Sequence, residues 1–349
     1  MRVRELKSAP LASEFLGALE ATEGATRTVN VPFAELAIGV DGKLAAGRHE
    51  YNLSPDARRQ LGRLMSVRNA TFDDLAPDTD LLNELLSRRL RRQLASSLLL
   101  NFSKNSADRI DRITVGNVPK CSTSQVLSCA LTAADDAKIT GDIRAICYPN
   151  NDATEIALIS SEMNVEVVSG DFTFGGVHIL SDNEGSVQVG TATWRLVCAN
   201  GAMMRVHSEQ QKPCRIRRAN NDLDGSKLLA DVANLSLLAW RSWAATSARI
   251  TELTKEPLGD TESILTRLRG RPFFVSKKTA QLVRNLLVAA GRHLTLYDLL
   301  QALTDVGTHG PREHGVRNQY AHRLRLGGGA LLQSRVRLCR ACQQFVLVN

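Results

Sequence analysis

The segment from Gly170 to Arg218 constrains the fold more than any other part of the chain. Apolar residues alternate with small or polar ones on both sides of the turn Ser181-Asp-Asn-Glu-Gly-Ser186. A period of two is typical of strands with one buried face, so the segment predicts a long β-hairpin at the centre of the fold. Asn200-Gly201 predicts a second turn, because glycine adopts a positive φ without a steric penalty.

The hairpin belongs to a longer region with the same period of two, in which Gly and Asn residues separate the alternating segments. Short turns between strands favour antiparallel pairing, because parallel pairing needs long crossovers. The sequence therefore predicts an α+β fold with a central, mainly antiparallel sheet. The further strands are expected at 112–115, 126–131, 139–148 and 155–159.

Helical patterns lie on either side of the predicted sheet. Ser54-Pro55 has the residues of a helix start, and Ser276 and Thr295 are candidate N-caps of later helices. The expected helices span about 54–65, 80–100, 222–255, 261–268, 276–290 and 295–306. These patterns divide the chain into an N-terminal arm with short strands (1–53), N-terminal helices (54–111), an antiparallel sheet core (112–220) and a basic C-terminal helical region (221–349).

Length and composition set the class of protein. A chain of 349 residues can bury a substantial core. No apolar run approaches the length of a bilayer span, and the first residues lack the apolar core of a secretion signal, so we expect a cytoplasmic protein without a membrane partner. The seven cysteines are odd in number and scattered, which argues against a disulfide framework.

Positive charge is concentrated in the C-terminal part of the chain. Residues 1–200 carry 21 Lys and Arg against 25 Asp and Glu, whereas residues 201–349 carry 23 against 11. An asymmetry of this kind indicates a polyanionic partner, and an acidic protein would satisfy it as well as a nucleic acid.

No arrangement of residues meets the requirements of a known catalytic site. Gly327-Gly-Gly329 lacks the Gly-Lys-Ser/Thr ending of a phosphate-binding loop. The pairs Asp73-Asp74 and Asp135-Asp136 read as solvated turns. Cys339 and Cys342 have the spacing of half a zinc site, but the other ligands would have to come from His309, His314 or His322. We therefore predict no catalytic residue, cofactor or metal, and keep zinc at Cys339 and Cys342 as an alternative.

Two cationic clusters are the best candidates for a binding site. Phosphate recognition needs cations along a track, and an aromatic residue within such a track can stack on an unpaired base. Phe273 and Phe274 lie in the second cluster, although a Phe-Phe pair is commonly core and an arginine cluster commonly a solvated helix face. The predicted contacts are Lys212, Arg215, Arg217 and Arg218 of the first cluster with Arg205 before it, and Arg267, Arg269, Arg271, Lys277 and Lys278 of the second cluster.

Four segments, in this order, resemble the phage/plasmid-like DUF932 family. They are Tyr51 to Leu61, Asp142 to Ile146, Ser181 to Gly185 followed by Trp194 to Met203, and Leu296 to Thr304. The likeness extends from about Val31 to Leu332, and its most specific element is Arg195-Leu-Val-Cys-Ala-Asn-Gly201 after the Ser-Asp-Asn-Glu turn. Cys147-Tyr-Pro-Asn-Asn151 departs from the family pattern. The resemblance implies a protein of phages, plasmids or prophages and carries no established reaction.

Together these observations predict a non-catalytic nucleic-acid-binding protein of a mobile element, acting in DNA replication or recombination. Single-stranded or distorted DNA is the expected ligand, with single-strand binding or annealing as the activity and a homo-oligomer as a further expectation. Two alternatives stay open at this stage. One is an interaction protein that binds an acidic host factor in an anti-defence or regulatory role, and the other is a nucleic-acid-processing enzyme.

Overall fold

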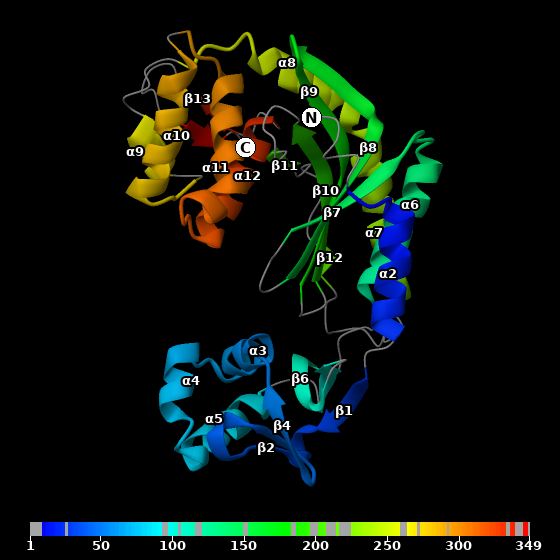
Figure 1. Cartoon of the computed structure of the whole chain (residues 1–349), viewed down its shortest axis with the longest axis vertical. Coiled ribbons are helices and arrows are strands. Elements are labelled where there is room, and N and C mark those ends of the chain that lie inside the picture. Colours follow the sequence, from blue (N-terminus) through cyan, green and yellow to red (C-terminus); the bar gives the residue numbers. More distant parts are fainter. Residues whose placement is uncertain are drawn as a thin grey trace.

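The computed structural model has an α+β architecture, as the sequence predicts, with three units that each have their own apolar core. A central sheet carries helices on one face, an α/β lobe lies below it in the view of Figure 1, and a helical bundle lies to its left. The structure describes residues 9–24, 27–92, 97–103, 106–115, 121–148, 153–182, 186–195, 202–206, 214–215, 225–258, 264–270, 273–291, 293–332, 336–338 and 345–347.

The central sheet contains the predicted hairpin. Strands β9 (Asp171–Asp182) and β10 (Ser186–Arg195) pair antiparallel from Ser181 opposite Val187 to Thr173 opposite Arg195. The sheet order is β11-β10-β9-β8-β7, all antiparallel, and β12 also pairs with β10. The remaining strands are β7 (Ile143–Tyr148), β8 (Ala153–Val168), β11 (Ala202–Val206) and β12 (Cys214–Arg215).

The period of two separates the two faces of this sheet. Val177, Ile179 and Val189 point to the face covered by α2 (Ala12–Gly24), α6 (Thr123–Asp136) and α7 (Ser226–Arg241). His178 and Trp194 alternate with them and point to the opposite face. The sheet is therefore buried on both sides, which explains why small and apolar residues fill it.

One predicted strand is wrong, because residues 126–131 belong to helix α6. Ser122 and Gln125 form a reciprocal capping box that starts this helix. Val126, Ala130 and Ala133 recur with helical spacing and are buried against α7 and the sheet. The Ser-x-x-Gln signal and the alanine content outweigh the β-branched residue at the start of the run.

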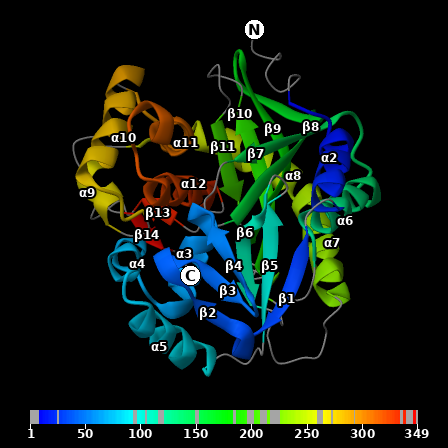
Figure 2. The same ribbon diagram turned by 60° about the horizontal axis from the view of Figure 1, so that its bottom comes forward.

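The N-terminal lobe combines strands and helices that the sequence divided differently. Its sheet has the order β1-β5-β6-β4-β3-β2, in which β4 pairs parallel with β6 and the other pairs are antiparallel (Figure 2). The strands are β1 (Thr28–Pro32), β2 (Leu36–Ile38), β3 (Leu44–Ala46), β4 (His49–Leu53), β5 (Ser97–Ser103) and β6 (Ser106–Val115), with 3-10 turns at Phe33–Glu35 and Val40–Gly42. The helices are α3 (Pro55–Met65), α4 (Asn69–Leu75) and α5 (Thr79–Leu90).

This lobe is an insertion between two helices of the central unit, because α2 packs with α6 beside the central sheet. The helix expected over 80–100 ends at Leu90, and the leucine run that follows forms the buried strand β5. Leu98, Leu99 and Leu100 are all buried there. Burial on both faces of the strand removes the alternation that would have identified it.

The C-terminal bundle contains α8 (Trp243–Leu253), α9 (Ile264–Arg269), α10 (Lys277–Ala290), α11 (Leu296–Glu313) and α12 (Asn318–Leu332). A two-stranded sheet, β13 (Val336–Leu338) with β14 (Phe345–Leu347), follows. The expected N-caps at Ser54, Ser276 and Thr295 are confirmed, since each hydroxyl accepts a bond from a backbone N–H of the first turn. Helix α12 was not predicted, and it contains the Gly327-Gly-Gly329 run.

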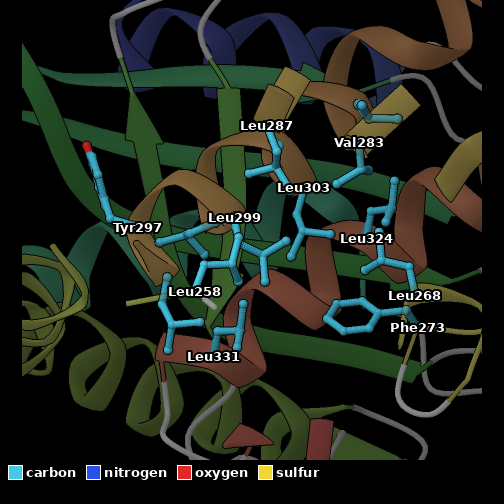
Figure 3. Close-up of a cluster of buried hydrophobic side chains, with 14 of the residues drawn as sticks. Leu258, Leu268, Phe273, Val283, Leu287, Tyr297, Leu299, Leu303, Leu324 and Leu331 are labelled. Atoms are coloured by element: carbon cyan, nitrogen blue, oxygen red, sulfur yellow. The ribbon is translucent and has the colours of Figure 1, made fainter. Parts of the chain in front are cut away.

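The core of the bundle explains Gly327, the first glycine of this run. Phe273 is completely buried, and its ring lies among leucines of α9 and α12 (Figure 3). A Cβ added to Gly327 would meet the Phe273 ring at 2.0 Å. Helix α12 must therefore carry no side chain at this position in order to approach the turn between α9 and α10.

Replacing Gly327 by Ala should destabilise the protein by about 1–3 kcal/mol, because the added methyl overpacks a filled core. Gly17→Ala is the matched control, since Gly17 lies in helix α2 with nothing within 4 Å of the added Cβ. It should stabilise the protein by about 0.5–1 kcal/mol through helix propensity. Urea unfolding measures both values. Equal stabilisation by the two substitutions would contradict the packing of Phe273 on Gly327.

Candidate nucleic-acid interface

The structure describes only the backbone of two members of the first predicted cluster. Arg205 lies in β11 opposite Ala192, and Arg215 lies in β12 opposite Ser186. Lys212, Arg217 and Arg218 lie outside the described residues. Figure 1 shows β12 at the lower end of the central sheet, whereas α9 and α10 lie at the outer edge of the bundle. The backbone of Arg215 therefore lies away from α9 and α10, whereas Arg205 lies on a strand that packs against α12.

The second cluster divides into a buried and an exposed part. Arg267 has an exposed fraction of 4% and belongs to the inner side of α9, so it does not reach the surface. Arg269, Lys277 and Lys278 are exposed. Arg271 lies outside the described residues. Three of the five predicted cations of this cluster thus stand on the outside of the bundle, on α9 and at the start of α10.

The helices that carry these cations contain no acidic residue. Helices α9, α10 and α12 hold seven Lys and Arg and no Asp or Glu, and the three acids of residues 264–332 all lie in α11. Within the described part of the chain, no carboxylate is within ion-pairing distance of Arg269, Lys277 or Lys278. Their charge is therefore not neutralised by a described neighbour.

The Phe273-Phe274 pair has one residue in the core and one at the surface. Phe273 is fully buried, whereas 48% of Phe274 is exposed. Phe274 has a φ of 45°, in the left-handed region that residues with a Cβ rarely adopt. Its N–H donates to the Gly270 carbonyl at 3.0 Å, and its own carbonyl accepts from Arg323 Nη1 at 2.7 Å. These bonds hold the backbone that turns the Phe274 ring outward.

Arg323 connects this turn to α12 and adds a further cation to the same surface. It is exposed, and its guanidinium carbon lies 5.9 Å from the centre of the Tyr320 ring. We call the surface formed by Arg269, Phe274, Lys277, Lys278 and Arg323 the basic face. Sequence reasoning missed Arg323 because the helix around it was not recognised; the available signal was a run from 318 to 332 without any acid.

A second polar cluster is buried between the central sheet and α12. Glu155 Oε1 of β8 accepts a hydrogen bond from His178 Nε2 of β9 at 3.0 Å, and Glu155 Oε2 is 3.5 Å from Arg325 Nη2. Arg325 also donates to the Gly307 carbonyl at 2.7 Å. Glu155 and His178 are 1% exposed. Because these two side chains are almost completely buried and Arg325 belongs to α12, we interpret the cluster as a contact that docks α12 on the sheet.

Two of the described thiols, those of Cys129 and Cys147, are not activated nucleophiles. Burial raises the pKa of the Cys129 thiol, and burial together with the nearby Glu155 charge raises the pKa of the Cys147 thiol. Among the described residues, no three His, Cys, Asp or Glu side chains gather closely enough to hold a metal ion. Cys339 and Cys342 lie outside those residues.

Comparisons of the chain with protein-family models, with curated proteins and with solved structures found no match. Among the described helices, none is both long and apolar enough to cross a bilayer.

The docking role of the buried cluster predicts that a single isosteric substitution strongly lowers the free energy of unfolding. Glu155→Gln should destabilise the protein by about 3–5 kcal/mol, because it leaves the largely buried Arg325 charge without its carboxylate. Combining it with Arg325→Met should recover part of the loss, which a double-mutant cycle of urea unfolding measures. The exposed Glu20→Gln on α2 is the control. Equal, small effects of Glu155→Gln and Glu20→Gln would contradict the assignment.

Proposed function

We propose that the protein binds nucleic acid through the basic face. The observation that carries the proposal is the set of exposed cations on helices that lack any acidic residue. A cation without a carboxylate partner can replace the counterions of a phosphate backbone, and the release of those counterions drives binding. The surplus of positive charge in the C-terminal part of the chain would also steer a polyanion toward this side.

The proposed setting is DNA replication or recombination of a phage, plasmid or prophage, in the cytoplasm of its host. This part of the proposal depends on the resemblance to the phage/plasmid-like DUF932 family and on the kind of ligand that the face suits. The proposal assigns binding to the face and no bond-making or bond-breaking step. Self-association through the sheet and helices stays a prediction from the sequence.

Removing the charge of the basic face should weaken binding of every nucleic-acid sequence to a similar extent. For Arg269→Ala, Lys277→Ala and Lys278→Ala combined, the slope of log K against log salt should become shallower by about 2, because each lost contact with a single strand removes about 0.7. Fluorescence anisotropy across a salt series gives this slope.

The control combines Lys227→Ala, Arg241→Ala and Lys255→Ala, which removes the same charge from exposed positions in α7 and after α8. It should leave the slope unchanged. An equal effect of the two triple variants would show that net charge alone governs binding. Polyglutamate should not compete with the oligonucleotide, whereas competition at equal charge concentration would favour an acidic protein partner instead.

A further inference from the structure

The backbone conformation and the exposure of Phe274 are both unfavourable in free energy. The packing of the folded chain does not explain why a phenylalanine occupies this position. A residue with a Cβ in the left-handed region is strained, and glycine or asparagine would make the same turn more easily. The position also exposes nearly half of an aromatic side chain to water. Strained residues persist where the surroundings fix them, as the bonds from Phe274 to Gly270 and Arg323 do here. A side chain held outward in this way suggests a contact with a ligand.

The neighbours of Phe274 restrict what that ligand can be. Lys277 and Lys278 follow it by three and four residues, and Arg269 precedes it by five. Arg323 contacts its carbonyl and lies near the Tyr320 ring. Phe274 is therefore within five residues of three exposed cations along the chain and is bonded to a fourth through its carbonyl. A ligand with both a flat apolar surface and a phosphate backbone matches this combination of groups.

We infer that the basic face selects single strands, with Phe274 stacking on an unpaired base. This inference rests on the nucleic-acid binding proposed above. The bases of a duplex are stacked on each other, so a duplex presents only its phosphates and the base edges in its grooves. It therefore leaves the Phe274 ring without a stacking partner. An unpaired base offers its face to the ring, whatever its identity. Single-strand selectivity follows from this ring, while the cations supply the salt-dependent affinity for either form.

The test compares a mixed-sequence single-stranded DNA of about 20 nucleotides with the duplex of the same sequence. This length exceeds the roughly 4–16 nucleotides that a single OB fold occupies. The probe is the labelled oligonucleotide, and anisotropy is recorded with the full chain. Phe274→Ala should weaken single-strand binding roughly 5- to 150-fold, the range expected for the loss of one base–aromatic stack. Duplex affinity and the salt slope should not change. Phe274→Trp, which keeps a ring for stacking, should retain single-strand affinity.

Phe274→Gly separates binding from folding. Because glycine tolerates the positive φ, this variant should melt at the same temperature as the wild type or higher, yet lose single-strand affinity as Phe274→Ala does. Wild-type binding of both DNA forms with no effect of Phe274→Ala would overturn the inference and leave the proposed function standing. Failure of the wild type to bind either form at low salt would overturn both.

Discussion

The burial of Phe273 against the bare surface of α12 is the contact on which the basic face depends. Its ring fills the core between α9 and α12, and Gly327 allows the helix to come close enough to cover it. Once Phe273 points inward, the next residue of the turn points outward. The same approach brings Arg323 to the Phe274 carbonyl. A packing contact in the core thus determines which aromatic ring and which cations meet at the surface.

A second constraint joins the bundle to the sheet. The Glu155 carboxylate lies between His178 of the neighbouring strand and Arg325 of α12, and Tyr297 of α11 donates to the buried Asp171 at 2.6 Å. Charged and polar groups taken out of water are costly unless they find partners. These partners come from segments distant in the chain, so they favour one position of α11 and α12 relative to the sheet.

The local chemistry of the sequence was enough to predict several elements. The hairpin followed from its period of two, and the caps at Ser54, Ser276 and Thr295 from their hydroxyls. Helix α6 was misread as a strand although its capping box was present, and β5 was hidden because both of its faces are buried. Helix α12 was missed because its glycine run argues against a helix locally. Gly327 of this helix packs against Phe273, a tertiary contact that a sequence pattern does not contain.

The candidate site was predictable only in part, because it also depends on packing between distant segments. Charge identified Arg269, Lys277 and Lys278, but only packing separates them from the buried Arg267 and separates Phe274 from Phe273.

The most direct test of nucleic-acid binding at the basic face is ultraviolet crosslinking of the full chain to single-stranded DNA, followed by mass spectrometry of the modified peptides. The account predicts crosslinks at Phe274 and at Tyr320. Crosslinks confined to the N-terminal lobe, with none in residues 269–278 or 318–325, would contradict it.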